Sequence, residues 1–328
     1  MKARDSVKNY PSALREMTNY SVRGIKKICA DVGARPSAGE QEFEAQKRMS
    51  AELEQCCDTV STQEFKVSAG KTSVSIIVSL IFIAAAAAMF FFDLGAFSVI
   101  PLVPAAVILF ALAFGKNILA PFFPKKTSHN IIGVKKASGE AKRRIIFSAN
   151  CDSTTKKRSA DGAVGAACNL SGCFAAMSVV KFMQRHDITP ESTDIWIVLT
   201  GSGKLGRSGA KTFAADMKDG VETVFIGFDT LADPNGIAVS AGDADTSALL
   251  KSAAEITGCT LRDNKASFAA SEAGAVSKKG IKAACLSAVP SGGIKEKEDK
   301  AENLNLSAIE NGIDMALELT FLFDSQGK

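Results

Sequence analysis

Two adjoining segments without a charged residue constrain this chain most. Residues 73–92 read SVSIIVSLIFIAAAAAMFFF, and residues 94–115 form a second uncharged run, with only Asp93 between them. About 20 helical residues cross the ~30 Å hydrocarbon layer of a bilayer, so each run is long enough to span it once. The sequence therefore predicts a transmembrane helical hairpin over residues 72–115, with the lipid bilayer as a partner. The alternative is a buried pair of helices inside a soluble core.

The residues between and beside the two runs indicate an orientation for this hairpin. An Asp at the bilayer centre would cost roughly 2.5–3.5 kcal/mol, so residues 93–95 are expected at the membrane interface as a tight turn. Pro101 and Pro104 then fall early in the second helix, where proline is tolerated. Five lysines flank the open end, namely Lys66, Lys71, Lys116, Lys125 and Lys126. By the positive-inside rule, we expect a multi-pass protein of the cell membrane whose globular part faces the cytoplasm.

Charge and cysteine content argue against two classes of protein. A formal charge of +4 over 328 residues, with 7% aromatic residues, is too small to indicate a nucleic-acid partner. The eight cysteines contain no C-x-x-C pair and are scattered along the chain. This pattern favours free thiols in a reducing compartment over a disulfide framework.

Outside the hairpin, apolar runs typical of strands alternate with helical patterns. Strands are expected at 63–67, 130–134, 144–149, 195–199, 224–228 and 283–288, and helices at 20–32, 39–53, 170–185, 209–217, 246–257 and 306–323. The alternation favours an α/β sheet covered by helices on both faces. Because segments on both sides of the hairpin complete the pattern, we expect residues 1–71 and 116–328 to form one domain, interrupted by the insertion at 72–115.

One glycine motif raises the possibility of a bound nucleotide. Gly201, Gly203 and Gly206 spell G-x-G-x-x-G after the apolar run 195–199, and Asp229 ends the next run. A strand, a glycine turn, a helix N-terminus and a carboxylate together form a dinucleotide fingerprint. This motif follows several strands, however, whereas the fingerprint usually opens its domain. A nucleotide-binding α/β protein therefore stays an alternative.

A series of motifs runs through the soluble part of the chain. In order they are GARPSAGEQEFEAQ (33–46), SHNIIGVKK (128–136), RRIIFSANCDS (143–153), CNLSG (168–172), LTGSGKLGRSGAK (199–211), FIGFDT (225–230), SKKGIKAACLSA (277–288) and EDKAENLNLSAIENG (298–312). This order resembles the di-zinc aminopeptidase family, which includes glutamate carboxypeptidases and glutaminyl cyclases. The resemblance implies a mixed, mostly parallel sheet. It also implies two zinc ions, held by two histidines and three carboxylates, and a further glutamate as general base.

The residues at the family's functional positions differ from that pattern. The resemblance places Asn150, Cys168, Lys204, Asp229 and Lys295 at the five ligand positions and Gly203 at the position of the base. Only Asp229 keeps the family's residue type, whereas a catalytic zinc needs about three protein donors. Gly203 has no group that accepts a proton. We therefore expect no cofactor and a non-catalytic pseudopeptidase that acts as a binding or scaffolding module for an unknown protein or peptide.

The substitutions also suggest an electrostatic replacement for the metals. If the correspondence holds, Lys204 and Lys295 enter a pocket that keeps Asp152, Asp229 and Asp299. Two ammonium groups could offset carboxylates that have lost their cations, and so avoid unpaired buried charge. The alternative is that both lysines point to solvent.

Other candidate groups support competing functions. An active zinc aminopeptidase with displaced ligands could use the available carboxylates Asp161, Asp187, Asp233 and Glu272. A dyad of Ser202 and Lys204 is a further candidate, although its spacing alone specifies no nucleophile. The two histidines, His129 and His186, are expected to be ordinary surface or cap residues, and Cys168 a small buried apolar side chain.

Overall fold

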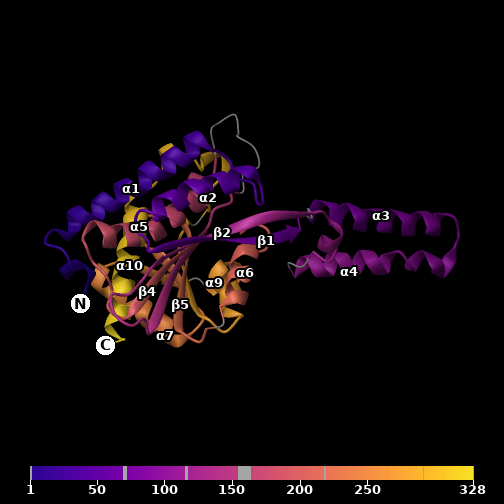
Figure 1. The fold of residues 1–328 in the computed structure, drawn as a ribbon. Coiled ribbons are helices and arrows are strands. Elements are labelled where there is room, and N and C mark those ends of the chain that lie inside the picture. The colour runs from indigo at the N-terminus through magenta and orange to yellow at the C-terminus, as the bar shows by residue number, and fades with distance from the viewer. Residues whose placement is uncertain are drawn as a thin grey trace. The chain divides into compact units, whose positions relative to one another are not determined.

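A computed structural model describes residues 2–68, 72–114, 117–153, 164–217, 219–263, 265–290 and 292–327 (Figure 1). Its eight strands are β1 (Thr59–Ser68), β2 (Lys125–Lys135), β3 (Arg143–Asn150), β4 (Thr193–Thr200), β5 (Glu222–Leu231), β6 (Ile237–Ala241), β7 (Leu261–Asp263) and β8 (Lys282–Ala288). They form one sheet in the order β1-β2-β4-β3-β5-β8-β6-β7. β4, β3, β5 and β8 run parallel, while β2 and β6 pair antiparallel with β4 and β8. The predicted mixed, mostly parallel sheet is confirmed.

Helices cover both faces of this sheet, and its central strands are therefore buried on both sides. One core joins the sheet to α1 (Tyr10–Asp31), α2 (Glu40–Leu53), α5 (Gly172–Arg185), α7 (Ala244–Thr257) and α10 (Leu306–Ser325). A second core, on the other face, holds α6 (Ser208–Asp216), α8 (Lys265–Ala270) and α9 (Glu272–Ser277). On β3, Ile145 and Phe147 belong to the first core and Ile146 to the second, as the alternation of side chains along a strand requires.

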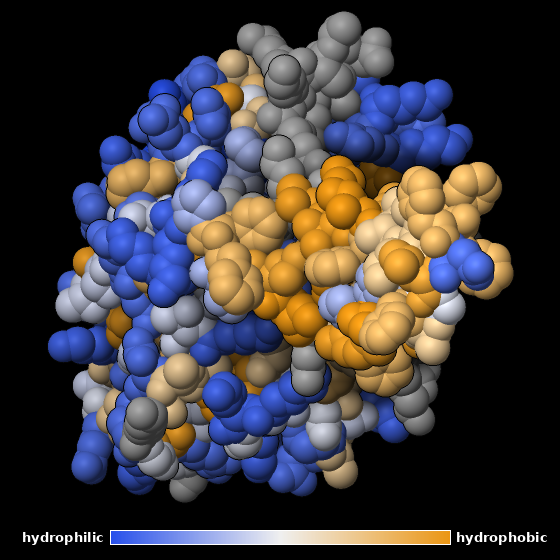
Figure 2. Space-filling model, turned by 90° about the vertical axis from the view of Figure 1, so that its right-hand side faces the viewer, coloured by the Kyte–Doolittle hydropathy of each residue, from blue (hydrophilic) through white to orange (hydrophobic). Residues whose placement is uncertain are grey.

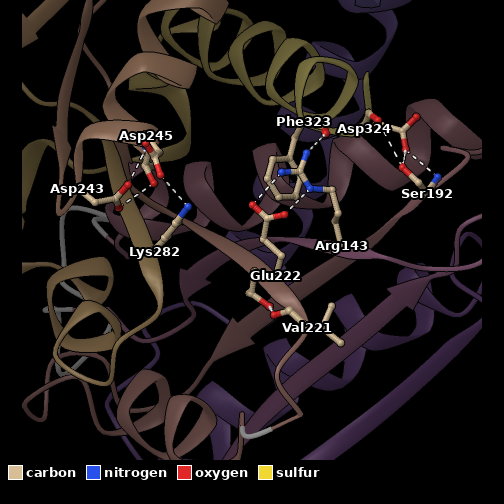
Figure 3. Close-up of polar contacts among 11 residues, drawn as sticks. Arg143, Ser192, Val221, Glu222, Asp243, Asp245, Lys282, Phe323 and Asp324 are labelled. Atoms are coloured by element: carbon tan, nitrogen blue, oxygen red, sulfur yellow. Dashed lines mark hydrogen bonds and ion pairs between the residues drawn. The ribbon is translucent and has the colours of Figure 1, made fainter. Parts of the chain in front are cut away.

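Polar contacts tie the amino ends of the strands to α10 (Figure 3). The Arg143 guanidinium donates two hydrogen bonds of 2.8 Å to the Glu222 carboxylate and one of 2.8 Å to the carbonyl of Phe323. It also lies 4.2 Å from the centroid of the Phe323 ring. The neighbouring Asp324 accepts the N–H groups of Glu191 and Ser192. The end of α10 is thereby fixed to β3, to β5 and to the segment that enters β4.

Residues 66–127 form a compact unit, and residues 1–65 and 128–328 form another. In the smaller unit α3 (Thr72–Phe91) is continuous, and the chain turns at Asp93, whose φ is 59°. The second apolar run is not one helix, in contrast to the prediction. A 3₁₀ helix, η2 (Gly95–Val99), precedes α4 (Leu102–Ala113). Pro101 and Pro104 have no amide hydrogen, so the hydrogen bonds of α4 cannot continue back through them.

Among the described residues, three helical segments are long and apolar enough to cross a membrane by length and composition. Two are Val74–Phe91 and Gly95–Ala113, which are 17% and 11% buried. The third, Ala166–Arg185, is 89% buried because it contains α5 in the core of the sheet. Apart from Leu306, the large apolar side chains that are exposed among the described residues all lie between positions 76 and 122. Figure 2 shows the broad apolar surface that results.

Candidate functional site

Three parallel strands bring the candidate residues together at their carboxyl ends. Asn150 ends β3, Gly203 and Lys204 follow β4, and Asp229 lies near the end of β5. These residues and Glu272, at the start of α9, line a small cleft of about 100 Å³. Ligands of open α/β sheets usually bind at this edge of the sheet.

The turn after β4 points four successive N–H groups at side chains of the protein itself. Gly201 donates to Asn130 at 3.1 Å, and Ser202 donates to the carboxyl group of Glu42 at 2.6 Å. The next two N–H groups, of Gly203 and Lys204, donate to Asp152 at 2.9 and 2.8 Å. Such a run of N–H groups makes a concavity for anions. Here the protein's own acidic and amide side chains take every one of these donors, which a pyrophosphate would otherwise need.

Asp152 is the buried centre of this arrangement. Besides the two backbone donors, its carboxylate accepts the Asn150 amide at 2.9 Å and the Ser37 hydroxyl at 2.5 Å. The residue is completely inaccessible to solvent. A Cβ at Gly203 would lie 2.4 Å from the Cβ of Asn150 and 3.0 Å from the Asp152 carboxylate. The space at position 203 is therefore already filled by Asn150 and Asp152.

Lys204 and Cys168 face each other in the cleft region. The Lys204 ammonium lies 3.3 Å from the Cys168 sulfur. Burial of Nζ acts to lower the pKa of Lys204, but nearby negative charge raises it overall. The interaction with the Cys168 sulfur is the largest of the effects that raise this pKa, followed by those with the carboxylates of Asp229 and Asp152. The Lys204 side chain is thus a cation near acidic groups.

The segment that carries Cys168 is held by Asp299. The Asp299 carboxylate accepts the N–H groups of Ala167 at 2.6 Å and Cys168 at 3.2 Å. Its backbone carbonyl accepts the N–H groups of Val164 and Gly165. Burial nevertheless raises the pKa of Asp299. Asp299 therefore positions this backbone, and its carboxylate is engaged with the N–H groups and does not line the cleft.

Lys295 does not join the cleft. Its side chain is 70% exposed, and its ammonium lies 3.5 Å from Glu298, three residues further on. The residue opens a 3₁₀ turn, η5 (Glu296–Glu298), at the surface. Of the two lysines expected to replace metal ions, only Lys204 lies beside acidic groups of the site.

Of the four carboxylates named as possible displaced ligands, Glu272 lines the cleft. Asp187 is exposed after α5, and Asp233 pairs with Arg262 at 2.8 Å. Asp161 lies outside the described residues. Glu272 is buried, accepts the hydroxyls of Thr200 and Ser148, and has a pKa that burial raises to about 7.

Neither the two histidines nor Ser202 of the possible dyad lines the cleft. The His129 ring stacks on Phe43 with centroids 3.8 Å apart, and His186 caps the carboxyl end of α5. The Ser202 hydroxyl donates to Ser128 at 2.9 Å, whereas the Lys204 ammonium contacts Cys168. Within the described ranges, no group of three His, Cys, Asp or Glu residues converges as metal ligands do.

Glu42 is a site residue that the sequence did not single out. Its carboxyl group accepts the N–H of Ala38 at 2.8 Å as well as that of Ser202, and it contacts the Ser128 hydroxyl at 3.3 Å. Burial, and then the negative charge of Asp152, raise the pKa of Glu42 to about 8. The only sequence signal was an acidic residue at the third position of a helix, which is also a common capping pattern.

The comparisons with known proteins agree with this fold. A family model described as peptidase family M28 matches residues 130–320. A zinc aminopeptidase from Bacillus subtilis superposes with a TM-score of 0.68 and 13% identity, over 93% of this chain and 95% of that chain. A glutaminyl cyclase from an Acidobacteriales bacterium gives 0.65 and 13%, over 94% and 95%.

A Zn-dependent exopeptidase from Parabacteroides distasonis gives a TM-score of 0.60 and 14% identity, over 93% of this chain and 97% of that chain. At these identities, the solved structures establish a shared fold. No curated protein sequence matches the chain.

Proposed function

The chain belongs to peptidase family M28, and we propose that it is a membrane-anchored member that binds or scaffolds a protein or peptide without hydrolysing it. The observation that carries this proposal is the packing around Gly203. The family resemblance assigns the general base to this position, and Asn150 and Asp152 leave no room there for a side chain. General-base catalysis typically contributes 10² to 10⁴-fold to a rate. Without a base at this position, the rate of hydrolysis should fall by a similar factor.

The donor set at the ligand positions does not fit two zinc ions. The Asn150 amide donates to Asp152 and its oxygen accepts from Asn169. Lys204 is a cation, and Lys295 lies at the surface. Cys168 and Asp229 are the two remaining donors, fewer than the three that a catalytic zinc needs. We therefore propose that the site works without a metal and that Lys204 supplies positive charge to it.

The helical pair would supply the membrane anchor. Its two segments are apolar, exposed and long enough to cross a bilayer. Lys66, Lys125 and Lys126 flank the pair, while Lys71 and Lys116 lie outside the described residues. Positive flanks stay on the cytoplasmic side, so we propose that the sheet domain lies in the cytoplasm. The eight free cysteines are consistent with that compartment.

One observation favours a second candidate, an active aminopeptidase. Glu272 lines the cleft, is buried, and has a pKa near 7, which suits a general base. In this case Glu272 would act in place of the residue missing at position 203. The nucleotide-binding alternative has no such support, because the N–H groups of the glycine turn are engaged by Glu42 and Asp152.

An activity assay separates the two candidates. The full chain in phosphatidylcholine nanodiscs is incubated with zinc and a panel of aminoacyl amides, and release of the amine is followed. We expect no release above that of empty nanodiscs. Hydrolysis that a chelator stops and that Glu272→Gln abolishes would overturn the proposal in favour of an active enzyme.

A further inference from the structure

A cavity between α1 and α2 shares no lining residue with the cleft at the strand ends. It has a volume of about 400 Å³, within the range of small-molecule sites. The Tyr20 and Phe174 rings meet edge to face in its wall, with centroids 6.0 Å apart. Buried Ile28 and Met49 extend this wall. The inner part of the cavity is therefore apolar.

The exposed side chains of the cavity are mainly basic. Arg23 and Lys27 lie four residues apart on α1, hence on the same face, and both are exposed. Neither forms an ion pair with an acidic residue among the described parts of the chain. Arg48 also lines the cavity, but Asp31 and Glu44 neutralise it at 2.5 and 3.0 Å. Glu52 is the one carboxylate in the lining, so positive charge predominates.

A glycine in α1 makes this geometry possible. Gly24 lines the cavity, and a Cβ there would lie 2.1 Å from the Phe174 ring. The backbone of α1 can therefore lie directly against the ring. The Lys181 ammonium, 6.0 Å from the centroid of the Tyr20 ring, adds positive charge near the same wall.

We propose that this cavity binds an anionic amphiphile with a single apolar chain. The apolar chain would lie against the half-buried Tyr20 ring and the exposed Ala51, and the carboxylate or phosphate head would pair with Arg23 and Lys27. Burial of the ligand's apolar chain contributes affinity that does not depend on direction. Charge-assisted hydrogen bonds from Arg23 and Lys27 then fix the position of its acidic head group. The proposal rests on this cavity alone and does not depend on the function of the cleft.

Equilibrium dialysis of labelled decanoate against the full chain in phosphatidylcholine nanodiscs tests the proposal, with empty nanodiscs subtracted. We expect saturable binding of one decanoate per chain, much weaker binding of the uncharged decan-1-ol, and none of acetate. Decyl phosphate, tested in parallel, identifies the preferred head group, and binding of either anion supports the site. Arg23→Gln with Lys27→Gln should weaken binding by about tenfold or more, because two charged hydrogen-bonding groups are removed.

Matched variants separate the cavity from general effects of the surface. Lys26→Gln removes an exposed charge of α1 that does not line the cavity, and should leave binding unchanged. Ala51→Phe should fill the mouth of the cavity and block binding, whereas Ala30→Phe, on the exposed surface of α1, should not. All the substituted residues are exposed, so the four variants should keep the native unfolding temperature. Binding that does not saturate, or that is equal in all variants, would overturn the proposal.

Discussion

At the scale of single residues, the polar groups beside the cleft form hydrogen bonds to one another. The buried carboxylate of Asp152 has four hydrogen-bond donors, and the Lys204 ammonium contacts Cys168. The sequence could predict that Gly203 and Lys204 meet Asn150 and Asp229, because motifs that follow parallel strands share one edge of the sheet. It could not predict the surface position of Lys295, because no periodic pattern fixes the segment around it.

Restoring an acidic residue at position 203 should not restore a general base. In Gly203→Glu, the new side chain would overlap Asn150 and place a second carboxylate beside Asp152. We expect the free energy of unfolding to fall by about 1–3 kcal/mol, as in other overpacked sites, with no gain in hydrolysis. Chemical denaturation and the aminoacyl amide assay measure the two effects. Gly292→Glu is the control, since a Cβ there meets no atom within 4 Å; equal stability of the two variants would contradict this account.

The raised pKa of Glu42 predicts how stability depends on pH. The pKa is about 8 in the folded protein against a reference value of 4.5, so the folded state binds more protons between these values. Stability therefore falls as pH rises from about 5 to 8. Glu42→Gln should lower the absolute stability, because an amide has a single acceptor oxygen and cannot accept the N–H groups of both Ala38 and Ser202, but it should flatten this fall. Denaturation midpoints measured from about pH 5 to 8 test this prediction. Glu54→Gln, at an exposed position, is the control and should keep the native dependence of stability on pH.

At the scale of elements, the long strands and helices were predictable and the short ones were not. The runs at 195–199 and 224–228 became β4 and β5, because continuous apolar segments between turns are buried strands. β6 and β7, with five and three residues, and the six-residue α8 and α9 gave no periodic signal. The position of Glu272 at the start of α9 was missed for that reason.

The contacts of Arg143 should stabilise the junction of the sheet with α10. Arg143→Ala removes a bidentate pair with Glu222, a bond to the Phe323 carbonyl and the stacking on its ring. We expect a loss of about 1.5–3 kcal/mol in the free energy of unfolding, measured by urea denaturation. Lys282→Ala breaks only the solvent-exposed pair with Asp245 and should change little. A larger effect of Lys282→Ala than of Arg143→Ala would contradict this account of the junction.

The apolar surface of α3 should determine association with membranes. Ile81 lies near the middle of the apolar segment and is 62% exposed. An Asp at the centre of a spanning helix costs roughly 2.5–3.5 kcal/mol, so Ile81→Asp should lower the fraction of protein that stays with membranes after alkaline extraction. Leu306→Asp changes an exposed apolar residue of α10 and should have no such effect. The same yield for both variants would argue against insertion of the helix.

At the scale of the whole molecule, the chain belongs to peptidase family M28, and residues 66–127 form a compact unit of their own. The superpositions cover more than nine-tenths of this chain and of the three structures described above, although identity is only 13–14%. The order of the motifs was enough to predict this fold, because it resembles that of the di-zinc aminopeptidase family. The arrangement of the site depends on contacts between residues far apart in the sequence, such as Glu42 with Ser202. Local sequence patterns do not predict such contacts.

The central claim is that this member of the family does not hold a catalytic metal. The most direct test is the zinc content of the full chain, purified in lipid nanodiscs after growth with added zinc and measured by elemental mass spectrometry. We expect well below one zinc per chain, because only Cys168 and Asp229 remain as donors at the family's ligand positions. One or two zinc ions per chain, retained on dialysis and lost in Asp229→Asn, would contradict it.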